Sequence, residues 1–345
     1  MRNNPIHNLQ NQHFSLAGIF TLALRIVAGW TYFSAFWRRL VLENKLDPEG
    51  AGYIGEKFNH FLPHALGIGP LIEYLVSTPE VLWWFMLIFT LVEGVVGFLF
   101  IFGIFTRFMS LSVFGLAMGI LLGAGWLGTT CLDEWQIGIL GIAAGFTIFL
   151  SGGGYYSFDR FMAEEFPNLA AKTWFTWLAS GPLPLNDLNL RRLALAGTFA
   201  IIFLSLFTNQ YFHGGLWGKL HNLSVKPHVT ITEPQLDAEH LRFTVFRDEG
   251  ADVYGSFLIG VKLENAVGET ILEKSGDDLS QLAVNQIRNA YVAKVKPGKH
   301  SLILPLGAKA ILTFPLPKAE NLAPGQYTLT LTDISGITWS EQIQF

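Results

Sequence analysis

Long apolar stretches are the feature that most limits how this chain can fold. Five of them precede residue 213, at residues 16–37, 81–102, 108–127, 135–152 and 192–212. A helix needs about 20 apolar residues to cross the hydrocarbon core of a bilayer, and about 17 is the lower limit. Because backbone amides inside lipid must bond within their own segment, these stretches are predicted to be transmembrane helices. The first is too long and too aromatic for a signal peptide, so we expect it to remain as an anchor.

The last third of the chain follows a different pattern. Apolar and polar residues alternate over five short segments, at residues 228–232, 241–246, 256–263, 310–314 and 327–332, with turn residues between them. Such alternation is typical of a small antiparallel sandwich, and we expect an immunoglobulin-like one. The sequence therefore predicts two domains. Residues 1–212 form a membrane all-α domain, a four-helix bundle plus a fifth transmembrane helix, and residues 213–345 form an all-β sandwich.

Composition removes several classes of function. Half of the residues are apolar and only 14% are charged, whereas soluble domains carry about a quarter. The net charge of −4, without a basic block, argues against a nucleic-acid partner. A single cysteine excludes a disulfide framework and a thiolate zinc site within the chain. Because heme, iron–sulfur and His-rich motifs are also missing, we expect no metal cofactor. A homo-oligomer is left open.

The distribution of Lys and Arg predicts the orientation in the membrane. With the N-terminus in the cytoplasm, the inner segments hold six of them: Arg2, Arg107, Arg160, Lys172, Arg191 and Arg192. The outer loops then hold four: Arg38, Arg39, Lys45 and Lys57. This bias predicts a multi-pass protein of the cell (inner) membrane, with its C-terminal domain periplasmic or otherwise outside the cytoplasm.

Two opposite charges lie inside the predicted spans. Arg25 and Glu93 each stand nine positions from the cytoplasmic end of their stretch, which is a depth of roughly 13 Å at 1.5 Å per residue. Because a lone charge in lipid is costly, we expect the two to pair across the bundle. The pair is either a structural ion pair that fixes helix register or a buried polar centre that handles a proton or an anion.

The predicted outer face gathers a second set of candidates from one loop and one helix end: Trp126, Cys131, Asp133, Trp135, Arg38 and Arg39. An anion arriving from outside would meet the arginines, and the indoles could contact a flat ring. The alternative is plain anchoring, since Trp and Arg are common at membrane interfaces and Asp133 can cap a helix. Cys131 is either a small packed residue or a thiolate favoured by the nearby helix N-terminus.

Several segments resemble a known membrane family. The sequence ALRIVAGW around Arg25 and the stretch from Glu93 to Arg107 resemble DoxX/DoxD proteins. TCLDEWQIG, residues 130–138, is more specifically similar to DoxD, which we expect to be the larger subunit of thiosulfate:quinone oxidoreductase. The last third resembles DoxA, the partner subunit, through GADVYGSF (250–257), NAYVAKVK (289–296), PLGAKA (305–310) and DISGITW (333–339). The chain thus resembles a DoxD–DoxA fusion.

The resemblance implies oxidation of thiosulfate to tetrathionate, with electrons passed to a membrane quinone as the accepting substrate. On that expectation the candidate catalytic residues are Cys131, Glu93 and Asp133, the candidate thiosulfate ligands are Arg25, Arg38 and Arg39, and the candidate quinone contacts are Trp30, Trp126 and Trp135. Two other functions stay open. One is a non-catalytic membrane module that docks a partner through its external β domain, and the other is a carrier of small anions.

Overall fold

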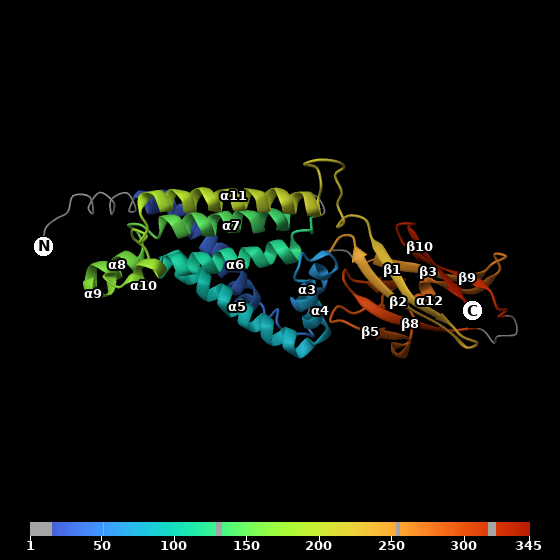
Figure 1. Cartoon of the computed structure of the whole chain (residues 1–345). Helices are drawn as coiled ribbons and strands as arrows, with labels where there is room; N and C mark the ends of the chain where they lie inside the picture. Colours follow the sequence, from blue (N-terminus) through green and yellow to red (C-terminus); the bar gives the residue numbers. More distant parts are fainter. Residues whose placement is uncertain (1–15, 51, 129–132, 253–255, 317–321) are drawn as a thin grey trace. The chain divides into compact units, whose positions relative to one another are not determined.

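The computed structural model describes residues 16–50, 52–128, 133–252, 256–316 and 322–345 (Figure 1). The chain divides into two compact units. Unit 1 comprises Met1–Ala51, Trp84–Gly125 and Asp133–His221, and unit 2 comprises Gly52–Trp83, Trp126–Leu132 and Asn222–Phe345. Unit 2 therefore groups two segments of the predicted transmembrane region with the C-terminal β region. The predicted domain boundary after residue 212 stays a prediction.

Helices make up unit 1. The long ones are α2 (Leu22–Phe36), α5 (Pro79–Phe102), α6 (Thr106–Ala124), α7 (Asp133–Ser151) and α11 (Asp187–Phe212), and the short ones are η1 (Trp37–Leu42), α8 (Phe158–Glu165), α9 (Pro167–Ala170) and α10 (Thr173–Leu178). Within the described residues, four helices are long and apolar enough to cross a membrane: Pro79–Phe102, Thr106–Ala124, Glu134–Ser151 and Asp187–Phe212. They confirm four of the five predicted stretches.

The first predicted span, residues 16–37, is not among these four. A turn at Thr21 interrupts the helix, so that α2 has 15 residues before it continues into the π-helix η1. Taken alone, α2 is shorter than the roughly 17 to 20 residues that a membrane-spanning helix needs, although η1 extends it directly. Membrane crossing by this segment therefore stays a prediction.

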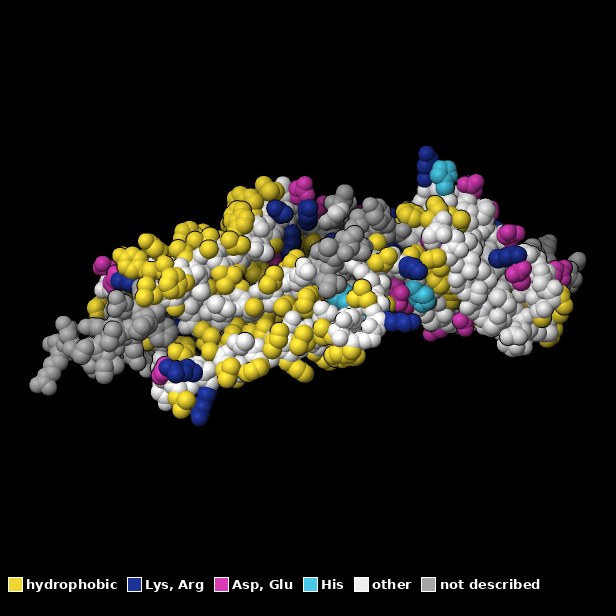
Figure 2. All heavy atoms as spheres, turned by 90° about the horizontal axis from the view of Figure 1, so that it is seen from above, with side chains coloured by type: hydrophobic (Ala, Val, Ile, Leu, Met, Phe, Trp, Pro, Cys, Tyr) yellow, Lys and Arg dark blue, Asp and Glu magenta, His cyan; other side chains and the backbone are white. Residues whose placement is uncertain are grey.

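Small residues bring α6 and α7 close together. Added Cβ atoms on Gly138, Gly141 and Gly145 of α7 would lie 2.7–2.9 Å from atoms of α6, which is closer than real Cβ contacts. This confirms the close approach that glycine spacing predicts for membrane helices. The opposite arrangement holds for α11, whose most apolar 18-residue window has 0% of its residues buried. Figure 2 shows hydrophobic side chains spread over the helical part of the surface, as expected for helices that face lipid.

Unit 2 contains short helices and two antiparallel sheets. Its helices are α3 (Gly55–Phe61), η2 (Leu62–His64), α4 (Gly69–Ser77), α12 (Gly276–Leu279) and η3 (Val284–Gln286). One sheet has the order β1-β2-β8-β5, and the other has the order β10-β9-β3-β7-β6 with β4 paired to β3. The strands are β1 (His228–Leu236), β2 (His240–Glu249), β3 (Ser256–Asn265), β4 (Thr270–Ser275), β5 (Ile287–Asn289), β6 (Lys296–Pro297), β7 (Leu302–Leu304), β8 (Lys309–Pro315), β9 (Gln326–Asp333) and β10 (Thr338–Gln344).

All five predicted strands are present, and their alternation explains the core. Along β9 and along β8, every second side chain is buried. Side chains from both sheets, among them Phe243, Val261, Phe314 and Leu329, form one hydrophobic cluster. The all-β domain of antiparallel sheets predicted for the last third is therefore confirmed.

Candidate functional site

A buried ion pair joins η1 to α5 in unit 1. Arg39 contacts Oε2 of Glu93 through Nη1, and its Nη2 lies 3.5 Å from Oε1. The Glu93 side chain is 4% exposed and the Arg39 side chain 21%, so the carboxylate is the more buried partner. The two candidates that the sequence assigned to different roles, catalysis for Glu93 and anion binding for Arg39, thus form one contact. Arg38, the next candidate, is exposed.

The predicted ion pair between Arg25 and Glu93 is wrong. The guanidinium of Arg25 instead donates hydrogen bonds to three backbone carbonyl oxygens, those of Gly153 at 2.5 Å, Tyr156 at 2.5 Å and Ile101 at 3.4 Å. Its Nε is buried without a hydrogen-bond partner. Arg25 therefore binds the ends of other elements rather than a carboxylate.

The depth argument failed because the two helices are offset along their axes. The described helical segment begins at Leu16, before α2, and its i→i−4 hydrogen bonds continue from Thr21 to Arg25. Gly29 packs against Ile101 near the end of α5, so Arg25, one turn earlier, reaches the loop that follows α5. Glu93 is level with the other end of α2, where Arg39 follows.

A second fully buried arginine, Arg107, also binds backbone carbonyls. Its donors reach the oxygens of Phe149 at 2.9 Å, Thr176 at 2.6 Å and Gly181. Phe149 lies in the last turn of α7, where carbonyl groups lack helical partners and carry partial negative charge. Arg107 thus ties α6 to the end of α7 and to the segment that precedes α11.

Asp159 is a buried carboxylate in the same part of unit 1, and it accepts hydrogen bonds where the two arginines donate them. Its carboxylate accepts hydrogen bonds from the backbone of Phe105 at 2.6 Å, from the backbone and hydroxyl of Thr106 at 2.9 and 2.6 Å, and from Ser180 at 2.8 Å. Burial raises the pKa of Asp159, while the hydrogen bonds from Thr106, Ser180 and Phe105 oppose that rise. We call Arg25, Arg107 and Asp159 the helix-end clamp.

The three candidate tryptophans have different environments. Trp30 is 57% exposed on α2. Trp135 on α7 donates from Nε1 to Oγ1 of Thr208 on α11, at 2.9 Å. Trp126 belongs to unit 2, where it is fully buried and donates from Nε1 to the carbonyl of Phe61 at 3.2 Å. The indole is thus covered by other residues of unit 2, and the quinone contact predicted for Trp126 stays a prediction.

Cys131 lies outside the described residues, and Asp133 is described only as the first residue of α7. The backbone that leads to the cysteine is nevertheless fixed within unit 2. Gly128 donates its N–H to Oγ of Ser224 at 3.0 Å, and its carbonyl accepts from Nδ2 of Asn222 at 2.6 Å. The roles predicted for Cys131 and Asp133 stay predictions.

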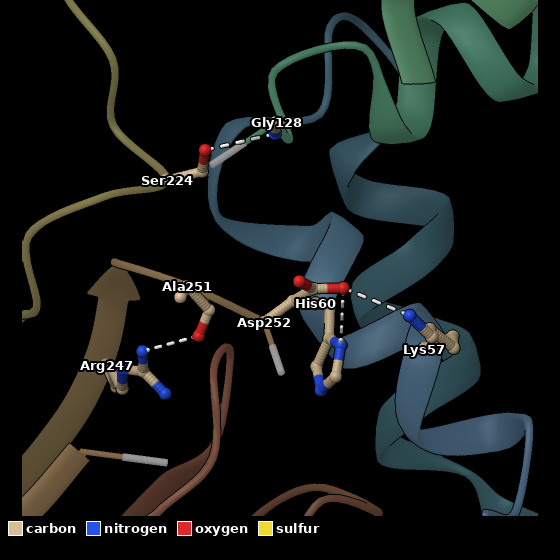
Figure 3. Close-up of polar contacts among 7 residues, drawn as sticks. All are labelled: Lys57, His60, Gly128, Ser224, Arg247, Ala251 and Asp252. Carbon is tan, nitrogen blue, oxygen red and sulfur yellow. Dashed lines mark hydrogen bonds and ion pairs between the residues drawn. The ribbon is translucent and has the colours of Figure 1, made fainter. Parts of the chain in front are cut away.

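Polar side chains from α3 and from the segment after β2 meet in unit 2 (Figure 3). Lys57 Nζ lies 3.0 Å from Oδ2 of Asp252, and Nδ1 of His60 lies 3.9 Å from the same oxygen. Arg247 is buried and donates to the carbonyls of Ala251 at 2.8 Å, Glu249 at 3.2 Å and Leu304 at 3.2 Å. Two cations therefore accompany one carboxylate.

Two imidazoles of this region are largely buried and incompletely bonded. Burial and the nearby charge of Lys57 lower the pKa of His60 to about 4, although Asp252 opposes the shift. Burial also lowers the pKa of His64, whose ring stands 4.8 Å from that of Trp126. Nδ1 of His60 and Nε2 of His64 are buried without a hydrogen-bond partner. Buried polar atoms in proteins usually have a hydrogen-bond partner. These two ring nitrogens have none among the described residues, so they can bind a polar ligand. We call Lys57, His60, His64, Arg247 and Asp252 the unit 2 polar cluster.

Asn59 holds the segments around the cluster together, and no sequence pattern points to this role. It is fully buried, donates from Nδ2 to the carbonyl of Gly307 at 3.1 Å, and accepts at Oδ1 from the N–H of Ala293 at 3.0 Å. Gly307 has φ +71°, and a Cβ there would overlap the carbonyl oxygen of Asn59. Only glycine fits such a position.

Residues 52–83 contact the β domain through segments that carry the DoxA resemblance. Asp252, Ala293 and Gly307 belong to three of the four segments on which the DoxA resemblance rests. From the second of these, Tyr291 also donates to Glu73 at 2.7 Å. The motifs could therefore have pointed to Asp252, but their partners in residues 52–83 carry no motif of their own.

Two family models match this chain. The first, described as TQO small subunit DoxD, matches residues 20–186, and the second, described as TQO small subunit DoxA, matches residues 212–342. The first description also corrects the expectation that DoxD is the larger subunit. Both matches lie in one polypeptide and in the predicted order. The chain therefore belongs to the DoxD and DoxA families and is a DoxD–DoxA fusion.

Proposed function

We propose that this chain oxidises thiosulfate to tetrathionate and passes the electrons to a membrane quinone. Two thiosulfate dianions, one quinone and two protons then give one tetrathionate dianion and one quinol. The observation that carries the proposal is that both family regions, whose descriptions name TQO (thiosulfate:quinone oxidoreductase), lie in a single chain. The four candidate membrane helices support it, because a quinone is delivered from lipid.

For thiosulfate we propose the unit 2 polar cluster together with the loop that carries Cys131. Lys57 and Arg247 supply positive charge, and ring N–H groups of His60 and His64 can donate to an oxyanion. Preorganised donors and cations of this kind lower the cost of joining two dianions. The exposed Arg38 stays a candidate ligand, whereas the carbonyl contacts of Arg25 support a structural role for that residue.

Cys131 offers a covalent route that balances without a metal. In the first step, the Cys131 thiolate and one thiosulfate form a sulfur–sulfur bond, and the two electrons released reduce quinone, which takes up two protons. In the second step, another thiosulfate attacks this adduct, which releases tetrathionate and restores the thiolate. Asp133 is the proposed acid–base neighbour. Undiminished thiosulfate-dependent quinone reduction by Cys131→Ala protein would eliminate the route.

For the quinone end we propose Glu93 as the group that supplies protons. Its carboxylate is buried in the apolar bundle beside Arg39, and we propose that it takes up protons from the aqueous side and passes them to the reduced quinone. The exposed Trp30 stays a candidate quinone contact, and Trp135 stays a candidate through the part of its ring that is not buried.

We propose the topology that the charge bias predicts, with the N-terminus in the cytoplasm and the C-terminal region outside. The single cysteine permits a direct test, because a membrane-impermeant thiol reagent then has one target. Labelling of Cys131 in intact cells is the expected result. Labelling that needs cell lysis would reverse the topology.

The deciding experiment uses purified full-length protein in detergent with a short-chain quinone. Thiosulfate should bleach the quinone, and tetrathionate should accumulate in equal molar amount to quinol. Sulfite and sulfide, offered in turn, identify the preferred donor. Anion flux into liposomes without a redox change would instead indicate a carrier, and the absence of both activities would indicate a docking module.

A further inference from the structure

Aromatic side chains form a continuous strip along α2, η1 and α5 of unit 1. The Phe33 ring centroid lies 5.8–6.1 Å from those of four neighbours: Trp30, Phe36, Trp37 and Phe98. We call these five residues the aromatic strip. Its outer members are open to the surroundings, since Trp30 is 57% exposed, Phe98 46% and Trp37 41%. The strip therefore begins at the exposed surface of the unit.

The inner end of the aromatic strip reaches the buried ion pair. Gly94 has no side chain, and the Phe36 ring fills the space beside it, because a Cβ on Gly94 would lie 2.6 Å from Cγ of Phe36. Gly94 directly follows Glu93, and Arg39 lies one turn after Phe36. The rings thus connect the exposed surface to the Arg39–Glu93 contact.

An unsatisfied hydroxyl lies beside this contact. Thr90 precedes Glu93 by three residues on α5, so their side chains share one face of the helix. Thr90 is 1% exposed, and its Oγ1 is buried without a hydrogen-bond partner. By contrast, the exposed Thr198 of α11 bonds its hydroxyl to the carbonyl of Ala194 at 2.8 Å, as is common in helices. Among the residues that the structure describes, none accepts a hydrogen bond from the Thr90 hydroxyl, which therefore remains available to an acceptor.

We propose that the aromatic strip and the Thr90–Glu93 face form the binding site for the quinone head group. This inference rests on the proposed function and locates its second substrate. A quinone is flat and lipid-soluble, and it carries hydrogen-bond acceptors at both ends. Its ring suits the faces of Phe33 and Phe36, and one carbonyl accepts from Thr90. Glu93 delivers protons as the ring receives two electrons from thiosulfate, while Arg39 positions Glu93.

The first test needs no turnover. A photoreactive azidoquinone is added to the purified full chain, with or without excess unlabelled quinone, and the labelled peptides are identified by mass spectrometry. We expect labelling within α2, η1 and α5 that the unlabelled quinone suppresses. Labelling confined to α7 or α11, labelling that competition does not suppress, or no labelling at all would each overturn the site.

The second test separates the two substrates. Thr90→Val keeps the shape of the side chain and removes the donor, so we expect the KM for quinone to rise about tenfold while the KM for thiosulfate stays unchanged. Thr90→Ser should restore most of the quinone affinity. Thr198→Val is the matched control, because its hydroxyl already has a partner within its own helix. An unchanged quinone KM in Thr90→Val, or an equal rise in both KM values, would contradict the proposal.

The two tests also distinguish this inference from the function on which it rests. If purified protein reduces no quinone with thiosulfate but shows competed labelling of α2 and α5, the proposed reaction fails and the quinone site stands. If turnover occurs while labelling falls elsewhere, the reaction stands and the site is wrong.

Discussion

The helix-end clamp and the Arg39–Glu93 contact are both buried groups of charges in unit 1, yet they are satisfied differently. In the clamp, arginine donors go to backbone carbonyls, and the Asp159 carboxylate accepts from backbone N–H and hydroxyl groups. In the bundle, two side chains satisfy each other and leave the Thr90 hydroxyl without a partner. Charges bound by the backbone fix where helices end. A side-chain pair can exchange partners, as the proposed reaction with quinone would require.

The largest expected effect comes from breaking the clamp. Arg107→Met would leave three partly buried carbonyl oxygens without the donors of a fully buried guanidinium, so we expect a loss of about 3–5 kcal/mol in the free energy of unfolding. Arg107→Lys should not rescue it, since one ammonium cannot span three separated acceptors. Thermal unfolding in detergent is the measurement. Arg191→Met is the control, because the Arg191 side chain is 77% exposed, and equal stability of the two variants would contradict the role of the clamp.

In unit 2, the buried and uncharged side chain of Asn59 also bonds to backbone groups. Asn59→Ala would remove the partners of the Gly307 carbonyl and the Ala293 N–H, at a cost of about 2–4 kcal/mol. Partial proteolysis should then cut residues 52–83 sooner than in the unaltered chain. Asn265→Ala provides a comparison, since Asn265 bonds at the surface. Equal proteolysis of both variants would show that Asn59 is not a structural anchor.

A change at Glu93 tests the other half of the comparison, the Arg39–Glu93 contact. Glu93→Gln keeps a hydrogen-bonding amide near Arg39 but cannot release a proton, so quinone reduction should fall by about a hundredfold. The melting temperature should change far less than in Arg107→Met. Steady-state quinone reduction and thermal unfolding are measured on the same preparation. A variant that is unstable but fully active per folded molecule would make Glu93 a structural residue like those of the clamp.

The smallest effect is a pH dependence from unit 2. His60 has a pKa of about 4 in the folded chain, below its ordinary value of 6.5, so the unfolded chain binds the proton at higher pH. Stability should therefore be constant above about pH 6.5 and should fall by about 2 kcal/mol as the pH drops toward 4. Denaturant unfolding at several pH values measures this slope. His60→Gln should flatten it, whereas His240→Gln, at a more exposed imidazole, should not.

Local patterns were enough to predict most of the fold. Four membrane helices and five strands follow from hydrophobic runs and alternation, because burial in lipid or in a sheet core imposes those patterns on neighbouring residues. The family assignment also follows from contiguous motifs. Residues whose partners are close in sequence were therefore within reach of the sequence alone.

The candidate site was only partly predictable. Glu93 and Arg39 were both selected, but with different partners, because sequence position does not reveal how far one helix is shifted along another. Asn59 and Thr90 were missed, since a single polar residue in an apolar segment gives no sign of whether its hydrogen bonds are satisfied. Trp126 was selected for its type, although only packing shows that its ring is fully covered.

The sequence by itself determined that this chain has membrane helices, a β domain and the two family regions. Tertiary structure alone decided that residues 52–83 pack with the β domain, that Arg25 binds carbonyls, and that Glu93 pairs with Arg39. The physical reason is the distance along the chain over which each interaction acts. Hydrophobic periodicity arises within a few turns of one element, whereas the partner of a buried charge is set by the relative shift of elements far apart in the chain.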